Sequence, residues 1–328
     1  MPDTTTSIPF GVYVPQGWRT DFDEITDPVA QYEAMTRAAQ EAERLGFDSI
    51  WLYDHFHTVP QPTRNTTFEC LTSLAGLARD TQRVKLGQMA VCNGYRPPAL
   101  LAKISSTLDV MSHGRLVLGL GAGWYEHEFR AYGYGFPDTR ERLRRLREAC
   151  EIVSRMWTED DPTFTGEYYS IDKPINEPKG VQQPHPPLWV AGSGEQVTLK
   201  LVARWGDGCN IGGMDPANLR HKLDILRRHC DTLGRDYDTI TRSTNVPMYI
   251  VESEASAERE LAPILANPGY AGYLRNGLTG TAEQIVERLQ ELVDAGARYF
   301  IAYLPRIASD HTQLQRLARD VAPHLRIP

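Results

Sequence analysis

The sequence predicts one (β/α)8 TIM barrel, an α/β fold in which eight parallel strands alternate with helices. Short runs rich in β-branched and aromatic residues alternate with amphipathic helical stretches along the chain, which is typical of a parallel sheet with helical crossovers. Eight such units can be counted. Barrels of this length commonly form one domain, so we expect residues 1–328 to fold as a single domain.

The first half of the chain shows the alternation clearly. In the first predicted helix, Tyr32, Met35, Ala38 and Ala42 recur at three- and four-residue spacings before Gly46 ends it. The predicted strands are Phe10–Val14, Ser49–Tyr53, Lys85–Val91 and Leu116–Leu120. The predicted helices are Pro28–Leu45, one starting near Phe68, one after Pro97-Pro98, and Thr139–Trp157.

The alternation breaks at Glu159–Pro187, where prolines recur around a strand-like stretch, Thr163–Ile171. We interpret this segment as an insertion between strands four and five that overhangs the barrel mouth. The remaining strands are predicted at Leu188–Val190, Gly208–Ile211, Thr244–Val251 and Tyr299–Tyr303, with helices near Gln196, Ala217, Thr281 and Gln313. An open doubly wound sheet is the alternative, but it would need a Gly-rich phosphate turn after the first strand.

Composition narrows the possible partners. A formal charge of -7 disfavours nucleic acid, so we expect a small-molecule substrate. No apolar run is long enough to span a membrane, and Met1 to Pro9 lacks the features of a signal peptide, so we expect a cytoplasmic protein. The cysteines are odd in number and widely spaced, which predicts buried thiols rather than disulfides or a zinc cluster. They are Cys70, Cys92, Cys150, Cys209 and Cys230.

The loops after the strands should carry the chemistry, because barrel active sites lie at that end. Strand two ends in Tyr53-Asp54-His55-Phe56-His57. Imidazole titrates near neutral pH, so His55 is a candidate proton donor or acceptor, although it could instead only hydrogen-bond the loop. A His-x-His pair also suggests a metal hydrolase, but the loops after strands five and eight offer no further metal ligands. We therefore predict no metal.

Two Gly-rich loops suggest a phosphorylated cofactor. Strand four leads into Gly119-Leu120-Gly121-Ala122-Gly123-Trp124, where bare backbone could lie against a ligand. This is nearly a dinucleotide fingerprint, but Trp124 stands in place of the third glycine. After strand five, Ala191-Gly192-Ser193-Gly194-Glu195 is predicted to open a helix, whose free N–H groups would form an anion site.

These segments resemble the luciferase-like monooxygenase superfamily, and more closely its coenzyme F420-dependent oxidoreductase branch. The resemblance runs nearly end to end. It rests on Trp51 to Phe56, Leu118 to Trp124, Ala191 to Gly194, and the segment from Gly280 through Gln284 to Gly296. It implies a barrel of the luciferase-like type that holds a deazaflavin, coenzyme F420, at its mouth.

The resemblance also implies a role for particular residues. His55 would be the catalytic proton donor or acceptor beside the ring carbon that exchanges hydride, and Asp54 would lie near the ring's polar edge. The remaining cofactor-binding residues would be Met89 and Ala90, joined by a cis peptide bond, then Ala122, Gly123 and His127, and the phosphate loop Ala191, Gly192, Ser193 and Gly194. Where the branch's sugar-phosphate dehydrogenase has a catalytic glutamate, this chain has Trp124, which favours an apolar or aromatic substrate.

Several alternatives stay open. The same loops would serve a monooxygenase that uses reduced FMN supplied by a separate reductase, and a non-enzymatic module would bind neither cofactor. The resemblance further implies a homodimer paired through barrel helices. The substrate itself is not named by any motif, because the residues facing it would come from Gln16–Asp27, Val59–Thr67 and the Glu159–Pro187 insertion.

Overall fold

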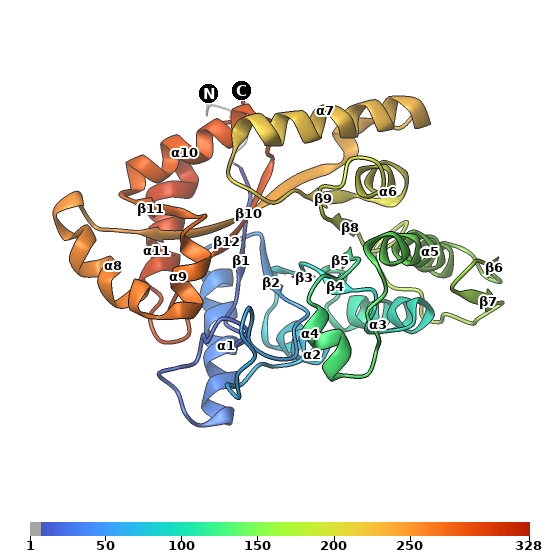
Figure 1. The fold of residues 1–328 in the computed structure, drawn as a ribbon, viewed down its shortest axis with the longest axis horizontal. Helices are drawn as coiled ribbons and strands as arrows, with labels where there is room; N and C mark the ends of the chain where they lie inside the picture. Colours follow the sequence, from blue (N-terminus) through green and yellow to red (C-terminus); the bar gives the residue numbers. More distant parts are fainter. Residues whose placement is uncertain (1–7) are drawn as a thin grey trace.

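The computed structural model describes residues 8–328 and contains a closed barrel of eight parallel strands (Figure 1). Each strand pairs with its neighbours in chain order, and the pairing of the first with the last closes the ring, as predicted. The barrel strands are β1 (Phe10–Tyr13), β2 (Ser49–Leu52), β3 (Lys85–Gln88), β5 (Leu116–Gly121), β8 (Leu188–Ala191), β9 (Gly208–Asn210), β10 (Thr241–Ile250) and β12 (Tyr299–Tyr303). Two short strands extend the sheet, β4 (Val91–Cys92) beside β5 and β11 (Leu278–Gly280) beside β10.

Helices surround the barrel, and local sequence sets their starts. Asp27 caps α1 by accepting a 2.7 Å hydrogen bond from the Ala30 N–H, and Asp215 caps α7 in the same way. A proline occupies the first turn of both helices. The helices that follow barrel strands are α1 (Pro28–Arg44), α2 (Cys70–Asp80), α3 (Pro98–Met111), α5 (Thr139–Thr158), α6 (Thr198–Trp205), α7 (Pro216–Leu233), α10 (Ala282–Asp294) and α11 (Thr312–Arg316).

Large aromatic side chains fill the lower part of the barrel interior. Trp51 and Trp189 lie with ring centroids 5.0 Å apart, and Tyr299 meets Trp189 edge-on. Gly87 makes room for them, because a Cβ there would lie only 2.4 Å from the Trp51 ring. These rings separate the open space at the carboxyl ends of the strands from a second cavity, of about 500 Å3, which Trp51, Trp189 and Tyr299 line at the amino ends.

The insertion does not overhang the mouth as expected. It forms a hairpin of β6 (Thr163–Thr165) and β7 (Ser170–Asp172), which lies at the edge of the molecule beside α5 (Figure 1). The buried Glu148 of α5 anchors it by accepting the backbone N–H groups of residues 167–169. Glu148 belongs to the helix layer outside the barrel and holds the hairpin there. As a result, none of residues 159–187 lines the cavity at the barrel mouth.

Three helices were not predicted: α4 (Glu126–Ala131), α8 (Ala257–Ala266) and α9 (Pro268–Leu274). Each is short, and Pro263 lies inside α8, so a helical period has little length over which to show. Residues 8–328 contain no helix with the length and apolar character needed to cross a membrane. Residues 1–7, which carry most of the expectation about a signal peptide, lie outside the described part. All the cysteines are free and buried, as predicted.

One buried cation joins α2, β3 and α3. Arg115 is 9% exposed, and its side chain donates to Ser112 O, Ala78 O, Thr81 O, Thr81 Oγ1 and Val84 O. A guanidinium carries five N–H groups, so every donor is used. Four carbonyl groups and one hydroxyl accept from it, and no carboxylate of the described chain bonds to it directly, although the charge of Glu43 acts on it from further away.

We predict that Arg115→Met lowers the free energy of unfolding by about 3–5 kcal/mol, since four buried carbonyl oxygens lose their donors at once. Urea unfolding measures this change. Arg130→Met is the matched control, because Arg130 lies in an exposed ion pair with Glu126 and should cost about 0.5 kcal/mol or less. An Arg115→Met loss as small as that of the control would contradict the prediction.

Candidate active site

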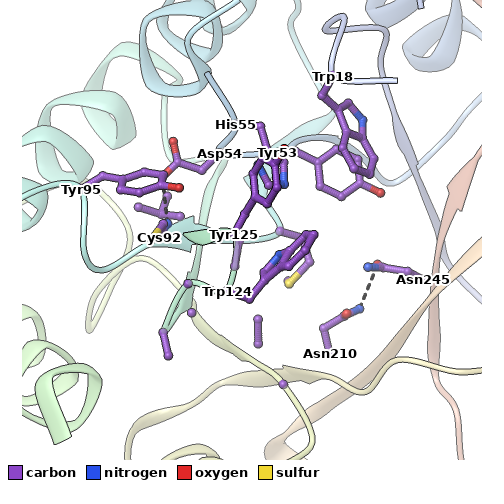
Figure 2. Close-up of a pocket in the computed structure, with 18 of the residues that line it drawn as sticks. Trp18, Tyr53, Asp54, His55, Cys92, Tyr95, Trp124, Tyr125, Asn210 and Asn245 are labelled. Atoms are coloured by element: carbon purple, nitrogen blue, oxygen red, sulfur yellow. Dashed lines mark hydrogen bonds between the residues drawn. The ribbon is translucent and has the colours of Figure 1, made fainter. Parts of the chain in front are cut away.

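A cavity of about 490 Å3 opens at the carboxyl ends of the barrel strands (Figure 2). One wall carries only small residues from three neighbouring strands: Ala90 after β3, Gly121 at the end of β5 and Ala191 at the end of β8. A Cβ built on Gly121 would lie 3.5 Å from the Ala90 Cβ and 3.6 Å from the Ala191 Cβ. This bare wall can therefore accept the face of a planar ring.

Aromatic side chains form the opposite side of the cavity. The Tyr53 ring stacks on Tyr13 at 3.9 Å and lies 3.9 Å from Trp18, and its hydroxyl lies 2.8 Å from that of Tyr273. Burial raises the pKa of Tyr53 and of Tyr273, so both phenols stay protonated. Asn210 and Asn245 supply a polar patch beside these rings (Figure 2).

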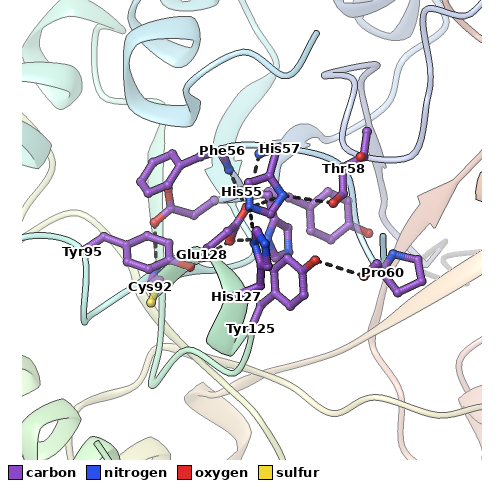
Figure 3. Close-up of polar contacts among 12 residues, drawn as sticks. His55, Phe56, His57, Thr58, Pro60, Cys92, Tyr95, Tyr125, His127 and Glu128 are labelled. Carbon is purple, nitrogen blue, oxygen red and sulfur yellow. Dashed lines mark hydrogen bonds and ion pairs between the residues drawn. The ribbon is translucent and has the colours of Figure 1, made fainter. Parts of the chain in front are cut away.

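His55 is held in the cavity by a buried carboxylate from α4. Its Nδ1 lies 2.9 Å from Glu128 Oε2, which also accepts the Tyr95 hydroxyl at 2.8 Å, while Oε1 accepts the Phe56 N–H (Figure 3). Burial alone would raise the pKa of Glu128, but the hydrogen bond and charge of His55, with those two further donors, hold it below its usual range.

An ionised carboxylate only accepts hydrogen bonds, so the hydrogen on the His55 ring next to Glu128 must sit on Nδ1. The Trp18 ring stacks on the imidazole at a centroid distance of 5.4 Å and fixes its plane. Nε2 makes no hydrogen bond with any residue of the described chain, and the side chain, which lines the cavity, is 10% exposed. His55 is therefore arranged to give or take a proton at Nε2.

Asp54 lines the same cavity, but its carboxylate is already engaged. Arg96 donates to both of its oxygens at 2.6 and 2.9 Å, and the Cys92 N–H donates to Oδ2 at 2.8 Å. Arg96 also donates to Glu69 at 2.6 Å. The negative charge of Asp54, which was expected to face the polar edge of a ligand, is thus neutralised by Arg96. Through these hydrogen bonds Asp54 holds the loop that follows β4 in place.

Most of the predicted site residues meet at this cavity. The ones that line it are Asp54, His55, Met89, Ala90, Ala122, Gly123, Ala191 and Gly192, and the Met89–Ala90 peptide bond is cis. His127, Ser193 and Gly194 do not line it. His127 is exposed, and its Nδ1 lies 3.1 Å from His57 Nε2 (Figure 3).

The loop after β8 also differs from the prediction. The helix begins at Thr198, two residues after the predicted start near Gln196, because a turn at residues 195–197 comes first. The buried Thr198 lines the cavity and was not predicted. Glu128, Arg96 and the two asparagines were likewise missed. Glu128 lies seven positions after Gly121, and no motif marks it, so only its contact with His55 identifies it. Among residues 8–328, no three His, Cys, Asp or Glu side chains gather so that they could hold a metal ion.

Comparison with known proteins gives consistent results. The luciferase-like monooxygenase family matches residues 8–299. An F420-dependent glucose-6-phosphate dehydrogenase from Kineococcus radiotolerans is 32% identical over 325 residues, covering 88% of this chain and 91% of the relative. The oxygenase component of a flavin-dependent trigonelline monooxygenase from Acinetobacter baylyi is 26% identical over 335 residues, covering 89% of each. The structure of an F420-dependent secondary alcohol dehydrogenase shares the fold, with a TM-score of 0.80 at 20% identity, covering 98% of this chain and all of that one.

The lowered pKa of Glu128 makes a prediction about acid stability. Since this pKa is lower in the folded chain than in the unfolded one, the carboxylate stabilises the fold above its unfolded pKa of about 4.3. That contribution is lost as the pH falls through the folded value. We predict that Glu128→Gln costs about 1–3 kcal/mol near pH 7 and that its difference from the wild type narrows below about pH 4.5.

Urea unfolding of both proteins between about pH 7 and pH 3.5 measures the difference. Glu126→Gln is the control, because this neighbouring carboxylate on α4 is half exposed. A Glu128→Gln deficit that stays constant across the range would show that the carboxylate charge plays no part.

Proposed function

Because the chain belongs to the luciferase-like monooxygenase family and is an enzyme of that family, we propose that it is an oxidoreductase that transfers hydride between coenzyme F420 and a small organic substrate. One observation carries the proposal: a bare wall of the cavity faces an imidazole whose free nitrogen points at the same space. Relatives named as F420-dependent enzymes support the choice of coenzyme.

The residues around the cavity fit a planar deazaflavin. Its ring would lie against Ala90, Gly121 and Ala191, where no side chain is longer than a methyl group. Its phosphate would lie at the loop Ala191–Gly194, where Gly192 has a φ of 116° that leaves the backbone open to a ligand. When bound, the coenzyme supplies or accepts the hydride.

The protein's own groups would manage the accompanying proton. His55 Nε2 would donate it to the substrate when hydride is delivered, or take it when the substrate is oxidised. Glu128 would keep the imidazole in one orientation by holding Nδ1–H and would stabilise the charged ring. Trp18 and Tyr273 would exclude water from the reacting atoms.

We propose an apolar or aromatic substrate. Several F420-dependent relatives are named for glucose 6-phosphate, which carries a phosphate dianion. Within residues 8–328, Arg19 is the one Lys or Arg that lines this cavity. Its Nη1 donates to Val59 O and its guanidinium lies over the rings of Trp18 and Tyr273, while its Nε has no hydrogen-bond partner there. A dianion would find a single cation here, whereas an aromatic substrate would meet a lining with six aromatic residues: Trp18, Tyr53, Tyr95, Trp124, Tyr125 and Tyr273.

The second candidate is a monooxygenase that uses reduced FMN from a separate reductase. The trigonelline monooxygenase relative favours it, since the same wall and loop would hold an isoalloxazine ring. The two readings differ in oxygen chemistry, because the deazaflavin does not readily react with oxygen. We retain homodimerisation as part of either proposal.

We predict that the purified protein binds reduced F420 at least about 10-fold more tightly than reduced FMN. The measurement is an anaerobic titration that follows the absorbance or fluorescence of each ring. Tighter binding of FMN, together with oxygen uptake when a substrate is added, would favour the monooxygenase instead.

We also predict that His55→Ala lowers turnover about 10^2- to 10^4-fold with little change in the Kd for F420, because proton transfer is lost while the wall is untouched. Turnover is followed through F420 absorbance with whichever compound of an aromatic panel supports it. His324→Ala, an exposed position, is the control and should change neither value. Normal turnover of His55→Ala with only a lower Tm would make His55 a loop residue.

A further inference from the structure

The upper layer of the barrel interior has two unlike halves. The bare wall of Ala90, Gly121 and Ala191 occupies the strands β3, β5 and β8. Asn210 on β9 and Asn245 on β10 follow next around the ring, where inward-facing side chains become polar (Figure 2). A ring that lies against the bare wall therefore turns its free face toward the two asparagines.

A directed chain of hydrogen bonds orients both amides. The Ser243 hydroxyl donates to Cys209 O at 2.7 Å, so its oxygen accepts from Asn210 Nδ2 at 3.0 Å. The second hydrogen of Asn210 Nδ2 goes to Asn245 Oδ1 at 3.1 Å, and this oxygen also accepts the Tyr13 hydroxyl at 3.0 Å. Neither amide can flip without breaking this chain.

The orientation leaves one acceptor and one donor for a ligand. Asn210 Oδ1 and Asn245 Nδ2 have no hydrogen-bond partner among residues 8–328, although Asn210 is only 5% exposed and both residues line the cavity. Neither atom is among the fully buried atoms that lack a partner, so both reach the open space of the cavity. A ligand that pairs with both atoms therefore binds more tightly than one that covers them without pairing. A ligand that satisfies neither leaves them unpaired.

We propose that Asn210 and Asn245 recognise a neutral substrate group in which a donor stands beside an acceptor, as in the C(=O)–NH edge of an aromatic lactam. The lactam N–H would donate to Asn210 Oδ1, and its carbonyl would accept from Asn245 Nδ2. An anion fits less well, because it brings no proton for Asn210 Oδ1. The inference rests on the proposed function and adds a substrate class to it.

The pyrimidine ring of a deazaflavin carries a similar imide edge, so the experiment must separate the two ligands. The probes are 2-quinolone, which has both groups, and N-methyl-2-quinolone, which lacks the donor. Naphthalene is the apolar reference. Kd values for the F420-loaded protein and for the protein without coenzyme are measured by ligand-observed NMR. We expect 2-quinolone to bind about 10-fold more tightly than its N-methyl derivative.

The variant Asn245→Asp tests the donor alone. It keeps an oxygen that accepts from Asn210 and Tyr13 but replaces the free N–H groups with a second oxygen. We expect it to weaken 2-quinolone about 10-fold and to leave naphthalene and F420 unchanged. The control Asn218→Asp makes the same chemical change at an exposed position of α7 and should alter no Kd.

Two results would overturn the inference. Equal affinity of the wild type for the two quinolones is one, and it needs no variant that must fold. The other is an Asn245→Asp protein that loses F420 affinity about 10-fold while its 2-quinolone affinity stays unchanged. The two asparagines would then bind the coenzyme rather than the substrate. Failure of F420 to bind, with quinolone discrimination intact in the protein without coenzyme, would overturn the proposed function alone.

Discussion

The interior of a closed barrel must be filled. Here the protein's own side chains fill the lower part and leave a cavity at the mouth, at the carboxyl ends of the strands. Trp51, Trp189 and Tyr299 pack the lower part. Above them, three neighbouring strands contribute only Ala90, Gly121 and Ala191. Protein interiors are close-packed, so a one-sided gap of this kind is space kept for another molecule. The placement of every other site residue follows from this gap, since each stands at its rim or across from it.

The two carboxylates nearest the gap have their hydrogen-bond partners within the protein. Glu128 is bonded by His55, Tyr95 and a backbone N–H, and Asp54 is bonded by Arg96. Buried charges need such partners, because the loss of hydration is otherwise uncompensated. The consequence is a cavity whose carboxylates have little charge to spare for a ligand. What remains for recognition is shape, aromatic surface, the two amides and the Arg19 guanidinium.

Features that depend on neighbouring residues could be predicted from the sequence. The order of the strands, the glycines at and after the end of β5, and the position of His55 after β2 each follow from a local pattern. Asn210 and Asn245 could not be found in this way. Their amides are brought together only when β9 and β10 pair, and Ser243 then fixes the orientation of the Asn210 amide. The place of the insertion likewise depended on Glu148, whose contacts lie about twenty residues further along the chain.

The exposure of the tryptophans gives the cavity its own optical reporter. Of the six in the chain, Trp124 alone is strongly exposed, at 61%, while Trp18 on the same cavity is 4% exposed. The emission colour of an indole depends on how much water surrounds it. A molecule that covered Trp124 at the mouth would change its intrinsic fluorescence, because that indole would lose the water around it. Occupancy of the cavity could then be followed without a label, through Trp124 and the neighbouring Trp18.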